Sequence, residues 1–141
     1  MLNYHNAHQP YIAAVVSALT AAGIGVTDWF ADPNDPRDAC ITLATYATEP
    51  HYPGETIVLT WTEEAGWLIG GGQPNELLDW VGELDTRDVL PTPQQVVVIA
   101  QTAFTAPTRT LHGLAPVYRE FVDDNDGFEQ RLASYDTHPD A

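Results

Sequence analysis

Apolar side chains near the start of the chain recur at helical spacing. Positions i, i+3, i+4 and i+7 form one apolar stripe, made of Ile12, Val15, Val16 and Leu19. Pro10 suits the first helical position, because its missing N–H would be unbonded there in any case. Gly23 suits the residue after the last turn, since glycine accepts the left-handed conformation. The pattern predicts a helix over Pro10–Ala22.

Alternation of apolar and polar residues then replaces the helical pattern, and it predicts four strands, at about 24–30, 39–46, 57–62 and 67–70. Prolines and turn-forming residues predict loops over Ala31–Asp38 and Ala47–Gly54. A hairpin loop over Glu63–Gly66 joins the last two strands. A three-residue loop would place Trp61 opposite Trp67 and a four-residue loop would pair it with Leu68, so the register stays open. The three glycines 70–72 are expected to end the sheet.

The second half of the chain reads mainly as helical. Apolar spacing predicts a short helix near Glu76–Leu84, weakened by Gly82. A second helix should begin at Thr92, which has capping-box spacing with Gln95, and end at Pro107, although a strand over 96–100 stays open. Residues 115–122 could form one helical turn, and a mobile acidic tail is expected from 123 onward.

These elements predict an α+β fold with an N-terminal helix, an antiparallel sheet of about four strands, one or two C-terminal helices and an acidic tail. Residues 1–107 would form the domain, and residues 108–141 an extension that is partly docked and then mobile. The chain is 141 residues long, about the size of one domain, and 44% of it is hydrophobic.

Charge narrows the possible partners. The chain carries 20 acidic residues against five arginines and no lysine, for a net charge of −15. The acids are evenly spread, with net charges of −7 over residues 1–70 and −8 over residues 71–141. With no basic cluster to neutralise phosphates, direct binding to nucleic acid or to an anionic membrane is not expected.

Cysteine usage and the termini give a default compartment. The single Cys40 excludes an internal disulfide framework and a cysteine-built zinc site. The N-terminus lacks the basic start and apolar stretch of a signal peptide, and no apolar run approaches the length of a membrane span. We therefore expect a cytoplasmic protein.

Two motifs together carry a family resemblance. The first is Trp-x-x-Asp-Pro-Asn-Asp-Pro-Arg-Asp at residues 29–38, and the second is Trp-x-Glu-Glu-x-Gly-Trp at residues 61–67. Over about residues 10–70 the chain resembles an uncharacterised actinobacterial family of small acidic domains. The resemblance implies a small domain from a high-GC Gram-positive source. It implies no activity, and it transfers no catalytic residue.

The first motif is the most distinctive candidate site. Its oxygen-bearing side chains could hold Ca²⁺ or Mg²⁺, and they are Asp32, Asn34, Asp35 and Asp38. The favoured alternative is that these side chains cap turns around the two prolines, while Arg37 pairs locally with Asp35 or Asp38. A third reading makes Arg37 the anchor for a protein partner.

The aromatic and titratable residues suggest surfaces rather than chemistry. Trp61 shares a strand face with apolar residues and should be core, whereas Trp67, just after a turn, should be partly exposed. Glu63 and Glu64, at a hairpin tip, should be solvated. His8 and its neighbour His5 should lie in an unordered N-terminus.

The chain has no metalloprotease, hydrolase or P-loop signature, so no enzymatic activity, catalytic residue, metal or cofactor is predicted. The leading hypothesis is a non-catalytic protein-interaction domain that binds a protein partner through the Asp32–Asp38 loop and the Glu63–Trp67 hairpin. Its expected contact residues are Asp32, Asn34, Asp35, Arg37, Asp38, Glu63, Glu64 and Trp67. The alternative is an acidic inhibitor of a basic protein, such as an immunity factor, an anti-defence protein or a DNA mimic. A small metal- or ligand-binding protein is a third possibility, and the oligomeric state stays open.

Overall fold

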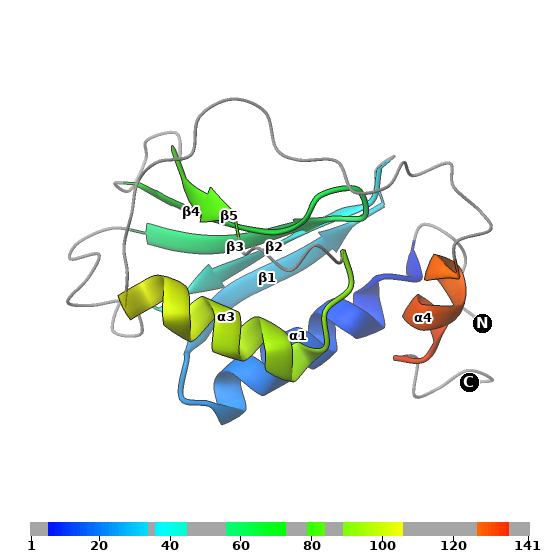
Figure 1. The fold of residues 1–141 in the computed structure, drawn as a ribbon, viewed down its shortest axis with the longest axis horizontal. Coiled ribbons are helices and arrows are strands. Elements are labelled where there is room, and N and C mark those ends of the chain that lie inside the picture. The colour runs from blue at the N-terminus through cyan, green and yellow to red at the C-terminus, as the bar shows by residue number, and fades with distance from the viewer. Residues whose placement is uncertain are drawn as a thin grey trace.

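The strands of the described residues form one antiparallel sheet, in which each strand pairs with the strands next to it along the chain. The computed structural model describes residues 6–33, 36–44, 56–72, 79–83, 89–105 and 127–135. The strands are β1 (Val26–Asp32), β2 (Asp38–Leu43), β3 (Thr56–Thr62), β4 (Gly66–Gly72) and β5 (Asp79–Glu83), and the helices are α1 (Gln9–Ala21), α3 (Pro93–Thr105) and α4 (Phe128–Ala133). Helices α1 and α3 pack together on one face of the sheet, and α4 lies near the start of α1 (Figure 1). The predicted α+β fold is confirmed.

Helix α1 forms where the apolar stripe predicts it. Four side chains of the helix are buried against the sheet and α3: Tyr11, Ile12, Val15 and Leu19. Gly23 ends the helix with φ = +84°, a conformation that strains any residue with a Cβ. The N–H groups of Gly23 and Ile24 donate to the last carbonyls of the helix, at 3.0 and 2.9 Å.

The capping box predicted at Thr92 sets the start of α3. The Thr92 N–H donates to Gln95 Oε1 at 2.8 Å, and the Gln95 N–H donates to Thr92 Oγ1 at 3.2 Å. These reciprocal bonds satisfy two amide donors. The stretch 96–100 is therefore helical, and the strand alternative for it is excluded.

The β3–β4 hairpin has the three-residue loop, and Trp61 pairs with Trp67. Gly66, at φ = +75°, supplies the turn conformation. Because the two tryptophans lie directly opposite each other, both point from the same face of the sheet into the core, with 0% and 1% of their surfaces exposed. Trp61 is core as predicted, and the expected partial exposure of Trp67 is wrong.

Hydrogen bonds tie the buried aromatic rings to the segment that leads into α3. Trp61 Nε1 donates to the Val89 carbonyl at 2.6 Å, and the Tyr11 hydroxyl donates to the Pro91 carbonyl at 2.5 Å. Trp67 Nε1 donates to the Tyr11 oxygen at 3.0 Å. The core is thus specified by directional bonds as well as by apolar packing.

Three predictions for individual segments are wrong. The expected helix near Glu76–Leu84 is replaced by β5, so the glycines 70–72 continue β4 and do not end the sheet. Gly82 gives this segment weak helix propensity, and pairing with β4 outweighs the apolar spacing. The Ala31–Asp38 loop is shorter than expected, because β1 runs to Asp32, which pairs with Asp38 at the start of β2.

The mobility expected from 123 onward is wrong for residues 127–135, where α4 buries Phe128 and Leu132 in the core. Those two apolar residues lie four positions apart, so one face of the short helix docks. The predicted segments 47–54 and 115–122 lie outside the described residues. In the described part of the chain, no helix has the length and apolarity needed to cross a membrane.

Candidate functional site

A buried ion pair joins the β1–β2 loop to the β3–β4 turn. The Arg37 guanidinium contacts both carboxylate oxygens of Glu63, with Nε to Oε2 and Nη2 to Oε1 each at 2.9 Å. The Arg37 N–H also donates to Glu63 Oε2 at 2.6 Å, and the Glu63 N–H donates to the Arg37 carbonyl at 3.1 Å. Both side chains are 0% exposed. Backbone and side-chain bonds together fix the two turns against each other.

Helix α4 supplies a second carboxylate to the same guanidinium. Arg37 Nη1 and Nη2 donate to the two oxygens of Glu129 at 3.1 and 2.5 Å, and the Phe128 ring lies 5.6 Å from the guanidinium carbon. Burial alone would lower the pKa of Arg37, but the hydrogen bonds and charges of Glu63 and Glu129 outweigh burial and raise it. Arg37 therefore stays charged and connects three segments that are distant in sequence.

His8 completes this buried cluster. Its imidazole is 0% exposed, stacks on Trp61 at 5.8 Å, and places Nε2 3.1 Å from the Asp38 carbonyl. Burial lowers the pKa of His8, and the positive charge of Arg37 lowers it further. Both effects favour the neutral form of the His8 imidazole. The expectation of an unordered N-terminus is wrong for His8, while His5 lies outside the described residues.

The predicted contact residues are divided between the interior and the surface. Arg37, Glu63 and Trp67 are buried, so the expectation of a solvated Glu63 is wrong, and Arg37 pairs with Glu63 and Glu129, which are distant in the sequence. Asp32, Asp38 and Glu64 are half-buried, whereas Asn34 and Asp35 lie outside the described residues. The motif over residues 29–38 therefore supplies the buried arginine that holds the β1–β2 loop against the β3–β4 turn. Arg37, the buried cation of this motif, pairs with Glu63, which lies 26 positions away in the sequence.

Strand β1 presents a surface that sequence reasoning missed. Side chains alternate along the strand, so Trp29 and Ala31 pack toward the core while Asp28, Phe30 and Asp32 lie on the opposite face. Phe30 is 48% exposed, although apolar-polar alternation alone gave no sign of which face it would take.

Three carboxylates lie near Cys40, the residue of β2 that pairs with Phe30. Cys40 pairs directly with Phe30 and is half-buried. Burial raises the pKa of the Cys40 thiol, a hydrogen bond from Thr42 opposes this, and the negative charges of Asp28, Asp38 and Asp32 raise it further. The three carboxylates therefore act together on one small region of the sheet. We call this region, made of Asp28, Phe30, Asp32, Asp38 and Cys40, the β1–β2 face.

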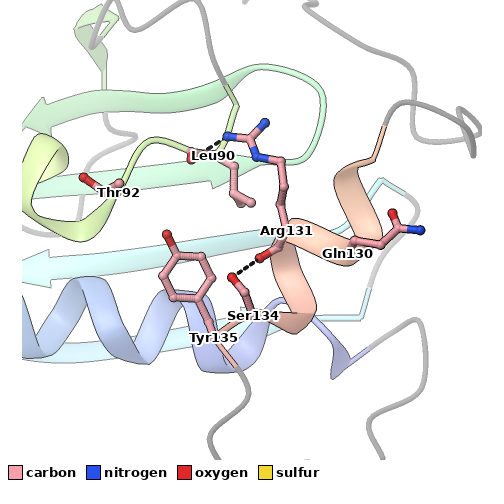
Figure 2. Close-up of a pocket in the computed structure, with 6 residues that line it drawn as sticks. All are labelled: Leu90, Thr92, Gln130, Arg131, Ser134 and Tyr135. Atoms are coloured by element: carbon pink, nitrogen blue, oxygen red, sulfur yellow. Dashed lines mark hydrogen bonds between the residues drawn. The ribbon is translucent and has the colours of Figure 1, made fainter.

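A separate hollow of about 390 Å³ lies between α4 and the segment before α3 (Figure 2). It is lined by Leu90, Thr92, Gln130, Arg131, Ser134 and Tyr135. Arg131 Nη2 donates to the Leu90 carbonyl at 3.0 Å, and Ser134 Oγ donates to the Arg131 carbonyl at 2.7 Å. The Arg131 guanidinium thus joins α4 to the segment before α3, and the Ser134 hydroxyl bonds to a carbonyl of the last turn of α4. Across the described ranges, no group of three or more His, Cys, Asp or Glu side chains is placed to hold a metal ion.

These features define a small α+β domain with one helix-backed antiparallel sheet and a loop end locked by a buried Arg–Glu pair. The chain belongs to DUF6292, a family of unknown function, whose model matches residues 11–102. The match spans the sheet and nearly all of α1 and α3, and it ends before α4. Searches of the curated proteins and of the solved structures found no match. The expected membership of an uncharacterised family is confirmed.

Proposed function

We propose that this protein is a non-catalytic protein-interaction domain whose contact surface is the β1–β2 face. The observation that carries the proposal is Phe30, a large apolar side chain that is 48% exposed on a strand otherwise flanked by carboxylates. An aromatic residue surrounded by polar and charged neighbours is the usual composition of a protein-binding hot spot and its rim.

The buried ionisable groups support a structural role for the motif rather than a catalytic one. Arg37 and Glu63 are 0% exposed and use their polar atoms on each other, on Glu129 and on backbone groups. A substrate has no access to them in the folded domain. Their effect on binding is indirect, because they hold the loop that connects Asp32 to Asp38.

The charge of the face indicates the chemistry of the partner. Asp28, Asp32 and Asp38 act together on Cys40, so a partner that covers Phe30 must also neutralise several carboxylates. A basic protein surface with an apolar centre fits both needs. The same carboxylates would repel nucleic-acid phosphates.

A second candidate function is an acidic inhibitor of a basic protein, and the net charge of −15 favours it. The two candidates differ in how binding responds to salt. An inhibitor that relies on charge would lose its target at moderate ionic strength, because exposed charges are screened over about 8 Å at physiological salt. An interface centred on Phe30 would keep its apolar part.

The proposal is tested by capture from a lysate of the source organism with the full chain immobilised. Phe30→Ser should remove the captured protein at both low and high salt. Val98→Ser is the matched control, since Val98 is an apolar side chain of α3 that is 60% exposed and away from the β1–β2 face. Equal capture by wild type and Phe30→Ser would contradict the proposed surface. A protein that the wild-type chain retains at low salt but loses at high salt would favour the inhibitor.

A further inference from the structure

Strand β1 is an edge of the sheet. It pairs with β2 on one side, and none of the other described strands pairs with it. In an antiparallel ladder, alternate residues of an edge strand direct their N–H and C=O groups away from the neighbour. Such a row of backbone groups is a template for another strand. Thr27, Asp28 and Phe30 are exposed along it.

The charges on β1 disfavour pairing with a second copy of the same strand. If two β1 strands paired antiparallel about Phe30, Asp28 of each copy would lie opposite Asp32 of the other. Like charges directly opposite each other destabilise a sheet. The chain also has no lysine, and no two of its five arginines lie four residues apart, so none of its own segments carries basic residues at the spacing of the two aspartates.

We propose that β1 binds an extended basic segment of its protein partner as an additional antiparallel strand. The segment carries two lysines or arginines four residues apart, opposite Asp28 and Asp32, and an apolar residue midway between them against Phe30. The two residues that separate the central apolar residue from the basic residues are also apolar. They lie beside the half-buried Trp29 and Ala31, on the core-facing side of the sheet. This inference rests on the proposed function and specifies how that surface recognises its partner.

The probe is the acetylated and amidated peptide Thr-Lys-Val-Val-Val-Lys-Thr, titrated into the isotope-labelled full chain. We expect shifts of the β1 amide resonances, slower hydrogen exchange of the outward β1 amides, and at least tenfold weaker binding when both lysines of the peptide are replaced by glutamate. Asp28→Asn and Asp32→Asn should each weaken binding by about 1.4- to 5-fold, the range for one cross-strand charge pair. Glu64→Gln, which removes a carboxylate from the β3–β4 turn, should leave it unchanged.

Two N-methylated peptides separate strand addition from side-chain docking. One carries N-methyl groups on the second, fourth and sixth amides, and the other on the third and fifth. Only one of these sets faces β1, so strand addition predicts that one peptide loses binding and the other retains it. Equal binding of both peptides, or no effect of the lysine peptide on β1, would overturn the inference. The proposed function would then still stand or fall on Phe30→Ser in the lysate experiment.

Discussion

Replacement of Arg37 by methionine tests whether the buried ion pair stabilises the loop end. The variant keeps a side chain of similar length but leaves the fully buried Glu63 carboxylate without its guanidinium. Removing one partner of a buried pair costs about 3–5 kcal/mol, because the remaining charge is uncompensated. A small domain has about 5–15 kcal/mol of total stability, so Arg37→Met should remove a substantial fraction of it.

The two carboxylates that contact Arg37 provide an internal comparison. Glu129 is 44% exposed, so its charge is solvated and screened, and Glu129→Gln should cost about 1 kcal/mol at most. The double variant Arg37→Met with Glu63→Leu removes both buried charges and should recover part of the loss. Recovery should be incomplete by about 1–3 kcal/mol, since the Arg37 backbone N–H would lose its acceptor on Glu63.

Urea unfolding at pH 7, followed by tryptophan fluorescence, measures these differences directly because Trp61 and Trp67 are both buried. The three variants should rank Glu129→Gln, then the double variant, then Arg37→Met in order of increasing destabilisation. A loss below about 1 kcal/mol for Arg37→Met, which is the range of exposed pairs, would refute the reasoning. So would a Glu129→Gln variant as unstable as Arg37→Met.

Three further predictions concern the core and the helix start. Tyr11→Phe should lower the free energy of unfolding by about 1–3 kcal/mol in urea, because the buried Trp67 N–H loses its acceptor. Thr92→Ala should cost about 1 kcal/mol and lower the melting temperature, since its hydroxyl accepts from the Gln95 amide; an unchanged melting temperature would count against the cap. The folded-state pKa of His8 is lowered from 6.5, so its contribution to stability is complete above pH 6.5 and is lost as pH falls through the lowered pKa. Melting temperatures from pH 8 to 5 should show this loss, and His8→Phe should remove that part of the pH dependence.

Local patterns predicted much of the fold because they act over a few residues. The apolar stripe and Gly23 located α1, and the Thr92–Gln95 spacing located the start of α3. The β3–β4 register followed once the loop length was known. Helix α4 was missed because only Phe128 and Leu132 mark its apolar face, within a segment rich in polar residues.

The candidate site was less predictable because it depends on contacts between distant segments. Glu63 looked solvated at a hairpin tip, yet the tip folds onto the β1–β2 loop and buries it against Arg37. The ratio of charges was the available signal. With 20 acidic residues and five arginines, each arginine has many possible carboxylate partners, and its neighbours in the sequence are only a few of them. The exposure of Phe30 depends on which face of β1 the helices cover, and a single strand does not encode that choice.

The most direct test of the central claim compares wild type, Phe30→Ser and Val98→Ser as immobilised full chains in one capture experiment from a lysate of the source organism. Each variant must first show the wild-type unfolding midpoint. The account predicts a protein retained at high salt by wild type and Val98→Ser and lost with Phe30→Ser, because Phe30 lies on the β1–β2 face and Val98 lies on α3. Retention of the same protein by all three, or its loss with Val98→Ser alone, would contradict the account.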